Sequence, residues 1–222
     1  MHTATRLAAG IITALLATAA LADPARSNAA LTVISPGDQV DYITSTTTQF
    51  CTIGYVYSGP DFHTYAVTAG HCRNSDSGYA RETRTGLTGN FVRTVVQPPR
   101  SGGPDYGLID FGRDSEPSVL VGNTPYTDDH PQPQVGQSVC HTGVTSGQHC
   151  GQIAAAQGAD QYLTTGMPAS LPGDSGGPVW TRPAHGFAQI IGIWLGEKTT
   201  AAGQEYGRFA SLATGLQLLS AS

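Results

Sequence analysis

The sequence predicts an all-β protein whose chain is divided into two β-rich halves. The 222 residues include 28 glycines and 14 prolines, and only 12% are charged. So much glycine and proline excludes a helical bundle, and so few charges exclude a coiled coil. Beyond the N-terminal segment, short runs rich in threonine, valine, isoleucine and tyrosine recur between turn residues.

Ten of these runs are expected strands, and their spacing is typical of a β-sandwich or of β-barrels. A polar stretch that contains prolines, at residues 112–134, separates the first four runs from the last six. Residues 210–219 are the one segment predicted to be helical. The expected strands are 50–57, 64–68, 91–96, 106–111, 138–141, 151–155, 161–164, 177–180, 187–194 and 205–210.

Residues 1–22 have the pattern of a secretory signal peptide. A weakly basic start precedes an apolar run at residues 7–21, and Ala20-Leu21-Ala22 matches an A-x-A cleavage site. The run is shorter than the roughly 20 residues that span a bilayer, although an uncleaved anchor is the alternative. We therefore expect an exported protein, without a membrane in its mature form. Its expected parts are a signal peptide (1–22), a short leader (23–33) and two β domains (34–115 and 116–222).

The charge balance argues against nucleic acid as a partner. The formal net charge is −5, with 11 basic and 16 acidic residues. Binding to phosphates requires clustered lysine and arginine, and the sequence contains no such cluster.

The four cysteines, Cys51, Cys72, Cys140 and Cys150, indicate two disulfides in an oxidising compartment. Of the three possible pairings we expect 51–72 and 140–150, because both are local and do not interleave. The alternative is a zinc site made of Cys140-His141 and His149-Cys150. Neighbouring side chains diverge on a strand, and exported thiols oxidise readily, so we predict no metal and no cofactor.

Three short motifs carry groups suited to acyl transfer. They are Thr-Ala-Gly-His-Cys at 68–72, Pro-Asp-Tyr-Gly-Leu-Ile at 104–109 and Gly-Asp-Ser-Gly-Gly-Pro at 173–178. A serine hydroxyl is a weak nucleophile until a base removes its proton, and histidine, with an ordinary pKa near 6.5, can do so at neutral pH. A carboxylate fixes the tautomer of that histidine. His71, Asp105 and Ser175 are the candidates.

The glycines around Ser175 permit a tight turn in which backbone N–H groups converge. The N–H groups of Gly173 and Ser175 are expected to hold a developing oxyanion. Each residue has a structural alternative: His71 could serve only the disulfide, Ser175 only a turn, and Asp110 or Asp114 could replace Asp105.

With these motifs the chain resembles the trypsin/chymotrypsin superfamily of serine peptidases. Residues 138–151 resemble its bacterial branch, the streptogrisin and α-lytic protease group, and the resemblance covers nearly all of the mature chain. It implies two antiparallel six-stranded β-barrels, a short C-terminal helix and an active site in the cleft between the barrels. It also implies that His71 is the base, Asp105 its orienting group and Ser175 the nucleophile of a monomer acting on proteins or peptides.

The resemblance also locates the pocket for the substrate side chain, and here the sequence departs from the family. Ala169 stands six residues before the nucleophile, where trypsin-type enzymes have aspartate. The other walls are expected from Ile193, Trp194, Leu195 and Glu205, with Leu195 narrowing the entrance. A charged side chain would lack a counter-ion, so we expect cleavage after small or medium apolar residues. The alternative is that Glu205 enters the pocket and restores a basic preference.

Two further departures lie near the triad. Ile193 is expected where the family usually has a serine that supports the triad aspartate. His141 follows the first cysteine of the second disulfide, where bacterial members have an arginine that pairs with the buried aspartate before the nucleophile. We expect a protonated His141 to pair with Asp174, which would give the pH–rate profile an alkaline limb. A neutral or solvent-facing His141 is the alternative.

The sequence therefore predicts a secreted serine endopeptidase that forms an acyl-enzyme intermediate. A binding module on the same fold is the main alternative, and Ile193 is the feature that favours it. An esterase is a weaker one, because the nucleophile motif is not the G-x-S-x-G of a strand–helix turn.

Overall fold

The computed structural model describes residues 31–97, 102–168, 170–182 and 186–221. Residues 31–222 form one compact unit. The predicted signal peptide, most of the leader, and Ala169 lie outside the described residues. Within the described ranges, no helix has the length and apolar content needed to cross a membrane.

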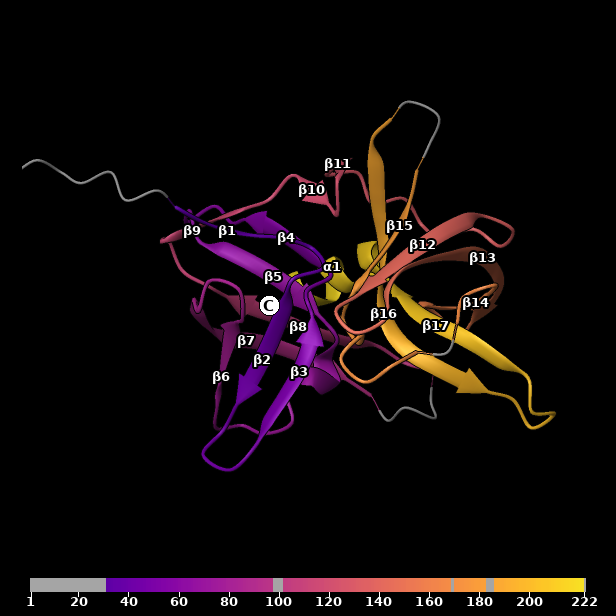
Figure 1. The fold of residues 1–222 in the computed structure, drawn as a ribbon, viewed down its shortest axis with the longest axis horizontal. Helices are drawn as coiled ribbons and strands as arrows, with labels where there is room; N and C mark the ends of the chain where they lie inside the picture. Colours follow the sequence, from indigo (N-terminus) through magenta and orange to yellow (C-terminus); the bar gives the residue numbers. More distant parts are fainter. Residues whose placement is uncertain (1–30, 98–101, 169, 183–185, 222) are drawn as a thin grey trace, which may run out of the picture. The chain divides into compact units, whose positions relative to one another are not determined.

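The first half of the chain forms a curled antiparallel sheet of seven strands (Figure 1). Its order is β3-β2-β6-β7-β8-β5-β4. The edge strands β3 and β4 are separated in the chain only by Ile53 and Gly54, so the two edges of the sheet meet at this corner. The strands are β2 (Gln39–Ile43), β3 (Thr48–Thr52), β4 (Tyr55–Ser58), β5 (Thr64–Thr68), β6 (Tyr79–Glu82), β7 (Thr88–Val96) and β8 (Asp105–Asp110).

The second half forms a closed barrel of six antiparallel strands, in the order β16-β15-β12-β13-β14-β17, closed by pairing of β17 with β16. Register shifts in β13 and β16 let these strands bend around the barrel. Its strands are β12 (Ser138–Gly143), β13 (Gly147–Gln157), β14 (Gln161–Thr165), β15 (Pro178–Thr181), β16 (Ala188–Thr199) and β17 (Glu205–Ser211).

Four short strands lie outside the curled sheet and the closed barrel. β1 (Thr32–Ile34) pairs with β9 (Ser115–Pro117), and β10 (Leu120–Val121) with β11 (Thr124–Thr127). The β1–β9 pairing and the pairing of β11 with β16 are parallel, which the expected antiparallel fold did not include.

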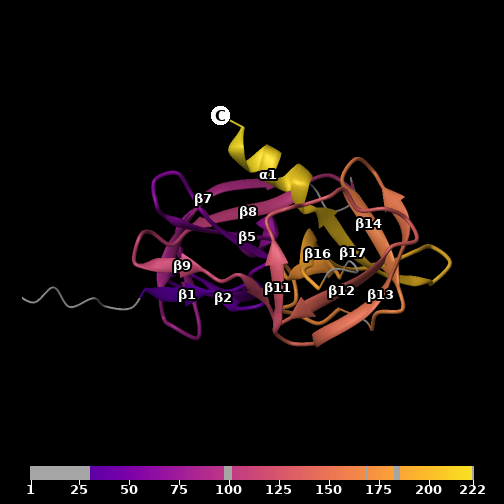
Figure 2. The ribbon, with the colours of Figure 1, turned by 90° about the horizontal axis from the view of Figure 1, so that it is seen from above.

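The helix α1 (Leu212–Ser220) follows β17 and contacts strands of both halves: β7 and β8 of the first, β16 and β17 of the second (Figure 2). Ser211 caps its N-terminus, because its hydroxyl accepts a hydrogen bond from the Thr214 N–H. Leu212 and Leu219 are buried. The predicted all-β double barrel with a short C-terminal helix is confirmed.

Each of the ten predicted runs overlaps a strand, but β1, β2, β6, β9, β10 and β11 were not predicted. These strands are short or carry charged residues. In β2, for example, Asp41 is only 6% exposed. Its carboxylate accepts a hydrogen bond from the Arg81 guanidinium of the neighbouring strand β6 at 3.0 Å, which compensates for its burial. Their hydrophobic signal is therefore weak in the sequence.

Tyr106 ties the two halves together. Its ring is buried, and its hydroxyl lies 2.9 Å from Asp160 Oδ2 and 2.8 Å from the Ser211 carbonyl oxygen. Burial raises the pKa of Asp160, and the hydrogen bond with Tyr106 opposes that shift. Since Tyr106 follows Asp105 directly in β8, this contact also fixes the strand that carries Asp105.

We expect Tyr106→Phe to lower the free energy of unfolding by about 1–3 kcal/mol, because the buried Asp160 carboxyl loses a donor. Urea unfolding at neutral pH measures this. Tyr162→Phe is the matched control, because Tyr162 stacks on Phe209 but its hydroxyl makes no hydrogen bond within the described residues. Equal losses in the two variants would show that the hydrogen bonds of Tyr106 contribute nothing.

Candidate active site

His71 and Asp105 form a doubly hydrogen-bonded pair in the first half. His71 lies on a single 3-10 turn, η1 (Gly70–Cys72), directly after β5, and Asp105 begins β8. The distance from His71 Nδ1 to Asp105 Oδ2 is 2.7 Å, and the His71 backbone N–H donates to Oδ1 at 2.8 Å. A carboxylate can only accept, so Nδ1 carries a proton, and in the neutral form of the ring Nε2 keeps its lone pair.

Ser175 is held beside this pair by the first half of the chain. Its carbonyl oxygen accepts a hydrogen bond from the Thr52 N–H at 2.8 Å and lies 4.0 Å from the Cys72 sulfur. Cys72 follows His71 directly in the chain, so the nucleophile candidate and the histidine are both next to this cysteine of the first disulfide. Both residues are described, and no hydrogen bond joins Ser175 Oγ to His71 Nε2. This bond is often long in an enzyme without substrate.

The loop before Ser175 is organised around the buried carboxylate of Asp174. Asp174 is 0% exposed. Its Oδ1 accepts from the backbone N–H groups of Thr145, at 3.1 Å, and Ser146, at 3.0 Å, and its Oδ2 from that of Leu171, at 2.9 Å. Hydrogen bonds to a charged acceptor are the strong kind, and these stabilise the carboxylate without a cation.

At position 173, both the backbone conformation and the available space require glycine. Its φ is +100°, and a Cβ at this position would overlap with the ring of Phe50. Its carbonyl oxygen accepts from Thr52 Oγ1 at 2.8 Å. In the described part of the chain, the N–H groups of Gly173 and Ser175 have no protein acceptor, so both are available to a ligand.

The ion pair expected between His141 and Asp174 is not formed. His141 is 2% exposed, and neither of its ring nitrogens has a hydrogen-bond partner. Its ring stacks on Trp194 with centroids 4.1 Å apart and an interplanar angle of 11°. Burial lowers the pKa of His141 to about 4, although the charge of Asp174 opposes the shift. His141 is therefore neutral at neutral pH, and an alkaline limb cannot come from it.

The residues expected to line the substrate side-chain pocket lie in different environments. Ile193 and Leu195 are 0% and 4% exposed and belong to the core, so Leu195 does not narrow an entrance. Glu205 is exposed where β17 begins, opposite Thr199. Trp194, between the two core residues, packs into the second barrel.

Both predicted disulfides, Cys51–Cys72 and Cys140–Cys150, are confirmed. The second joins directly opposite residues of β12 and β13. The alternative zinc site is wrong, because its two thiols are bonded to each other.

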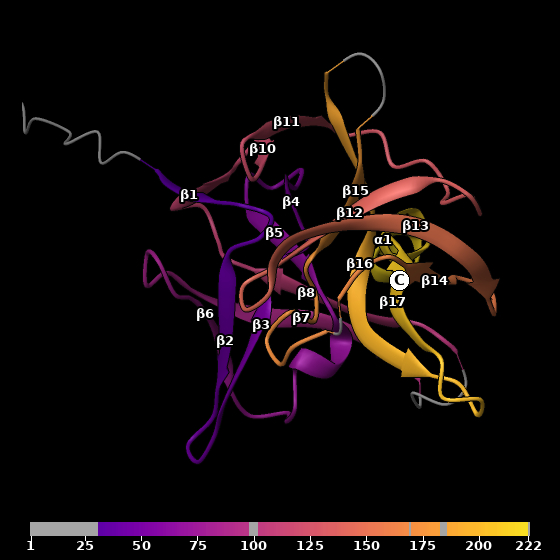
Figure 3. The same cartoon turned by 45° about the vertical axis from the view of Figure 1, so that its right-hand side comes forward.

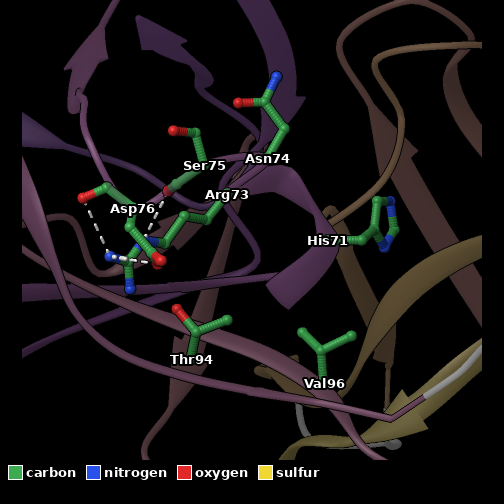
Figure 4. Close-up of a pocket in the computed structure, with 7 residues that line it drawn as sticks. All are labelled: His71, Arg73, Asn74, Ser75, Asp76, Thr94 and Val96. Atoms are coloured by element: carbon green, nitrogen blue, oxygen red, sulfur yellow. Dashed lines mark hydrogen bonds and ion pairs between the residues drawn. The ribbon is translucent and has the colours of Figure 1, made fainter. Parts of the chain in front are cut away.

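Asn74 lines two pockets, each of which also includes one of the candidate catalytic residues His71 and Ser175. One pocket is lined by His71, Thr94 and Val96, with Arg73 turned toward Asp76 at its other end (Figure 4). A second pocket also includes Asn74 and is lined by Thr48, Gln49, Phe50, Cys51, Pro172, Gly173 and Ser175. The two candidate catalytic side chains thus border accessible space.

Thr52 is a functional residue that sequence reasoning missed. Its backbone N–H and its hydroxyl hold Ser175 and Gly173, and its Oγ1 accepts from the Val144 N–H at 3.1 Å. Figure 3 shows the orange loop that precedes β15 beside β3, which carries Thr52. A threonine at the end of a strand is common and gives no signal of this role.

Because His141 is buried and neutral, we expect the free energy of unfolding to decrease as the pH falls. Above the ordinary pKa of 6.5 it is neutral in the folded and the unfolded chain. As the pH falls from about 6.5 to about 4, only the unfolded chain binds this proton, so the free energy of unfolding decreases by about 3 kcal/mol. We expect His141→Leu to remove this part of the pH dependence in urea unfolding between pH 7 and pH 4. Parallel curves for the two proteins would contradict the assignment.

Comparison with known proteins gives the family. The family model described as Trypsin matches residues 39–217. An uncharacterized protein of Mycobacterium tuberculosis is 30% identical over 181 residues, 77% of each chain. Serine protease 2 of Streptomyces fradiae is 30% identical over 143 residues, 59% of this chain and 79% of that protein.

The crystal structure of Nocardiopsis protease has the same fold, with a TM-score of 0.65 at 21% identity, and the match covers 85% of this chain and 97% of that one. The family model spans most of the chain and includes His71, Asp105 and Ser175. The chain therefore belongs to the trypsin family of serine-type endopeptidases.

Proposed function

We propose that this protein is an exported endopeptidase that cleaves peptide bonds through an acyl-enzyme on Ser175. The observation that carries the proposal is the pair of hydrogen bonds by which Asp105 holds both the backbone and the ring of His71. With Nδ1 bonded to Asp105, Nε2 is the ring nitrogen left to act as the base, and Thr52 holds the backbone of Ser175, the proposed nucleophile.

In the first step, His71 Nε2 removes the Ser175 proton as Oγ attacks the scissile carbonyl carbon. Asp105 stabilises the imidazolium that forms and keeps the ring in place. The same proton then passes to the leaving amine, and the peptide C–N bond breaks. Water repeats the sequence with His71 as base, which releases the acid product and restores Ser175.

The negative charge that develops on the carbonyl oxygen requires donors that are already in place. The N–H groups of Gly173 and Ser175 suit this role, because neither has a protein acceptor in the part of the chain that the structure describes. The hydrogen bonds of Asp174 and Thr52 hold the loop that carries them. Removing one such donor from a related site typically costs on the order of 10²–10³ in turnover.

The residue before the scissile bond is proposed to be uncharged and of small or medium size. Glu205 is exposed at the start of β17, and we propose that it stays in solvent and supplies no counter-ion to a basic substrate side chain. Burying an unpaired charge would then oppose binding of arginine or lysine.

A fluorophosphonate probe tests the proposed function directly, because it reacts with an activated serine without requiring a particular substrate side chain. We expect labelling of Ser175 in the native protein and none in Ser175→Ala. A folded protein that remains unlabelled would support the binding-module alternative instead.

We expect Ser175→Ala and His71→Ala each to lower turnover of a peptide substrate by on the order of 10⁴–10⁶, with the fold preserved. The double variant should be hardly worse than either single one, because the two side chains act in one step. Turnover measured on folded protein, verified by circular dichroism, gives the comparison. Losses that multiply in the double variant would mean that the two residues act separately.

A further inference from the structure

The indole of Trp194 occupies the place where three segments near Ser175 converge. Its Nε1–H donates a hydrogen bond at 2.9 Å to Oγ of Ser170, a residue in the segment that precedes the nucleophile. A Cβ on Gly207, in β17, would overlap with its ring. The family resemblance expects the walls of the substrate side-chain pocket to be these same segments. Trp194 is 1% exposed, so the space between them is filled.

The backbone of Trp194 is fixed directly beside the nucleophile. Its N–H donates to the Gly177 carbonyl oxygen at 2.8 Å, and its own carbonyl oxygen accepts from the Gly176 N–H at 2.7 Å. Gly176 and Gly177 are the two residues after Ser175. The backbone of Trp194, which carries the indole, therefore cannot shift without moving the nucleophile.

The ring itself is held from inside the barrel. It stacks on His141 and shares an apolar cluster with Val139, Val179, Ile191 and Phe209. His141 is neutral and makes no hydrogen bond that would draw it elsewhere, so it acts as a buried flat support for the indole. An indole that is packed and hydrogen-bonded in this way does not move aside without exposing a large apolar surface.

We infer that Trp194 sets the substrate specificity by filling the side-chain pocket, so that the enzyme cleaves after glycine or alanine and rejects larger residues. The inference rests on the proposed function and narrows its specificity, since valine and leucine would now clash with the indole. Tightly packed interiors do not tolerate an added side chain, and a whole aromatic ring far exceeds the single methylene that typically changes discrimination 10–200-fold.

The test uses quenched peptides of one sequence that differ only in the residue before the scissile bond: Gly, Ala, Val, Leu, Phe or Arg. For the native enzyme we expect kcat/KM for Phe to lie at least about 10²-fold below that for Ala. Trp194→Val should raise the Phe/Ala ratio by about 10-fold or more. The only other tryptophan, Trp180, is equally buried, so Trp180→Val is the matched control and should leave the ratio unchanged.

Fluorophosphonate labelling of each protein separates the two proposals. Absence of labelling in the native protein defeats the proposed function, whatever the peptides show. A labelled native enzyme that cleaves after Phe as well as after Ala overturns the role of Trp194, and so does a labelled Trp194→Val enzyme with an unchanged ratio.

If Trp194→Val does not fold, the native enzyme still decides the question. Peptide boronates that end in an alanine or a phenylalanine analogue bind the activated serine without turnover. We expect tighter inhibition by the alanine analogue by about 10²-fold, and equal inhibition would overturn the inference.

Discussion

The buried carboxylate of Asp174 is the constraint on which the arrangement of this site depends. A charge at 0% exposure must be compensated, and here three backbone N–H groups from residues 145, 146 and 171 do so. These donors come from two loops of the second barrel, so satisfying one carboxylate folds both of them together. Gly173 and Ser175, on either side of Asp174, are positioned as a consequence, and Thr52 then connects the loop to the first half of the chain.

Because backbone N–H groups compensate the charge of Asp174, His141 is not needed as its cation. A histidine that faces a barrel interior loses its proton to desolvation, and what remains is a flat, neutral ring. That ring supports the Trp194 indole, which reaches Ser170 on its other side. At position 141, a histidine stands where the resemblance expects a permanently charged arginine. This histidine contributes no charge to the nucleophile loop and instead packs beside it.

The fold, both disulfides and the position of the His71–Asp105 pair could be predicted from the sequence, because local motifs and β-rich runs specify them. Thr52 could not, because its role arises from three hydrogen bonds to residues far along the chain. The His141–Asp174 pair was wrong because sequence order gives proximity but not which donors reach a carboxylate. Ile193 and Leu195 were expected in a pocket wall, whereas both are buried in the core, which burial in the folded chain decides and local sequence does not.

The two sets of interactions around Ser175 differ in kind. The proposed base is fixed by hydrogen bonds within the first half, between His71 and Asp105, and the proposed nucleophile by the Thr52 hydrogen bond that crosses between the halves. The space proposed for a substrate side chain is filled by apolar packing within the second barrel, through Trp194 and His141. Packing contacts respond to side-chain volume and hydrogen bonds respond to donors and acceptors, so volume can change at position 194 without removing any group from the triad. A trypsin-family chain can in this way alter which peptides it accepts while the chemistry at its serine stays the same.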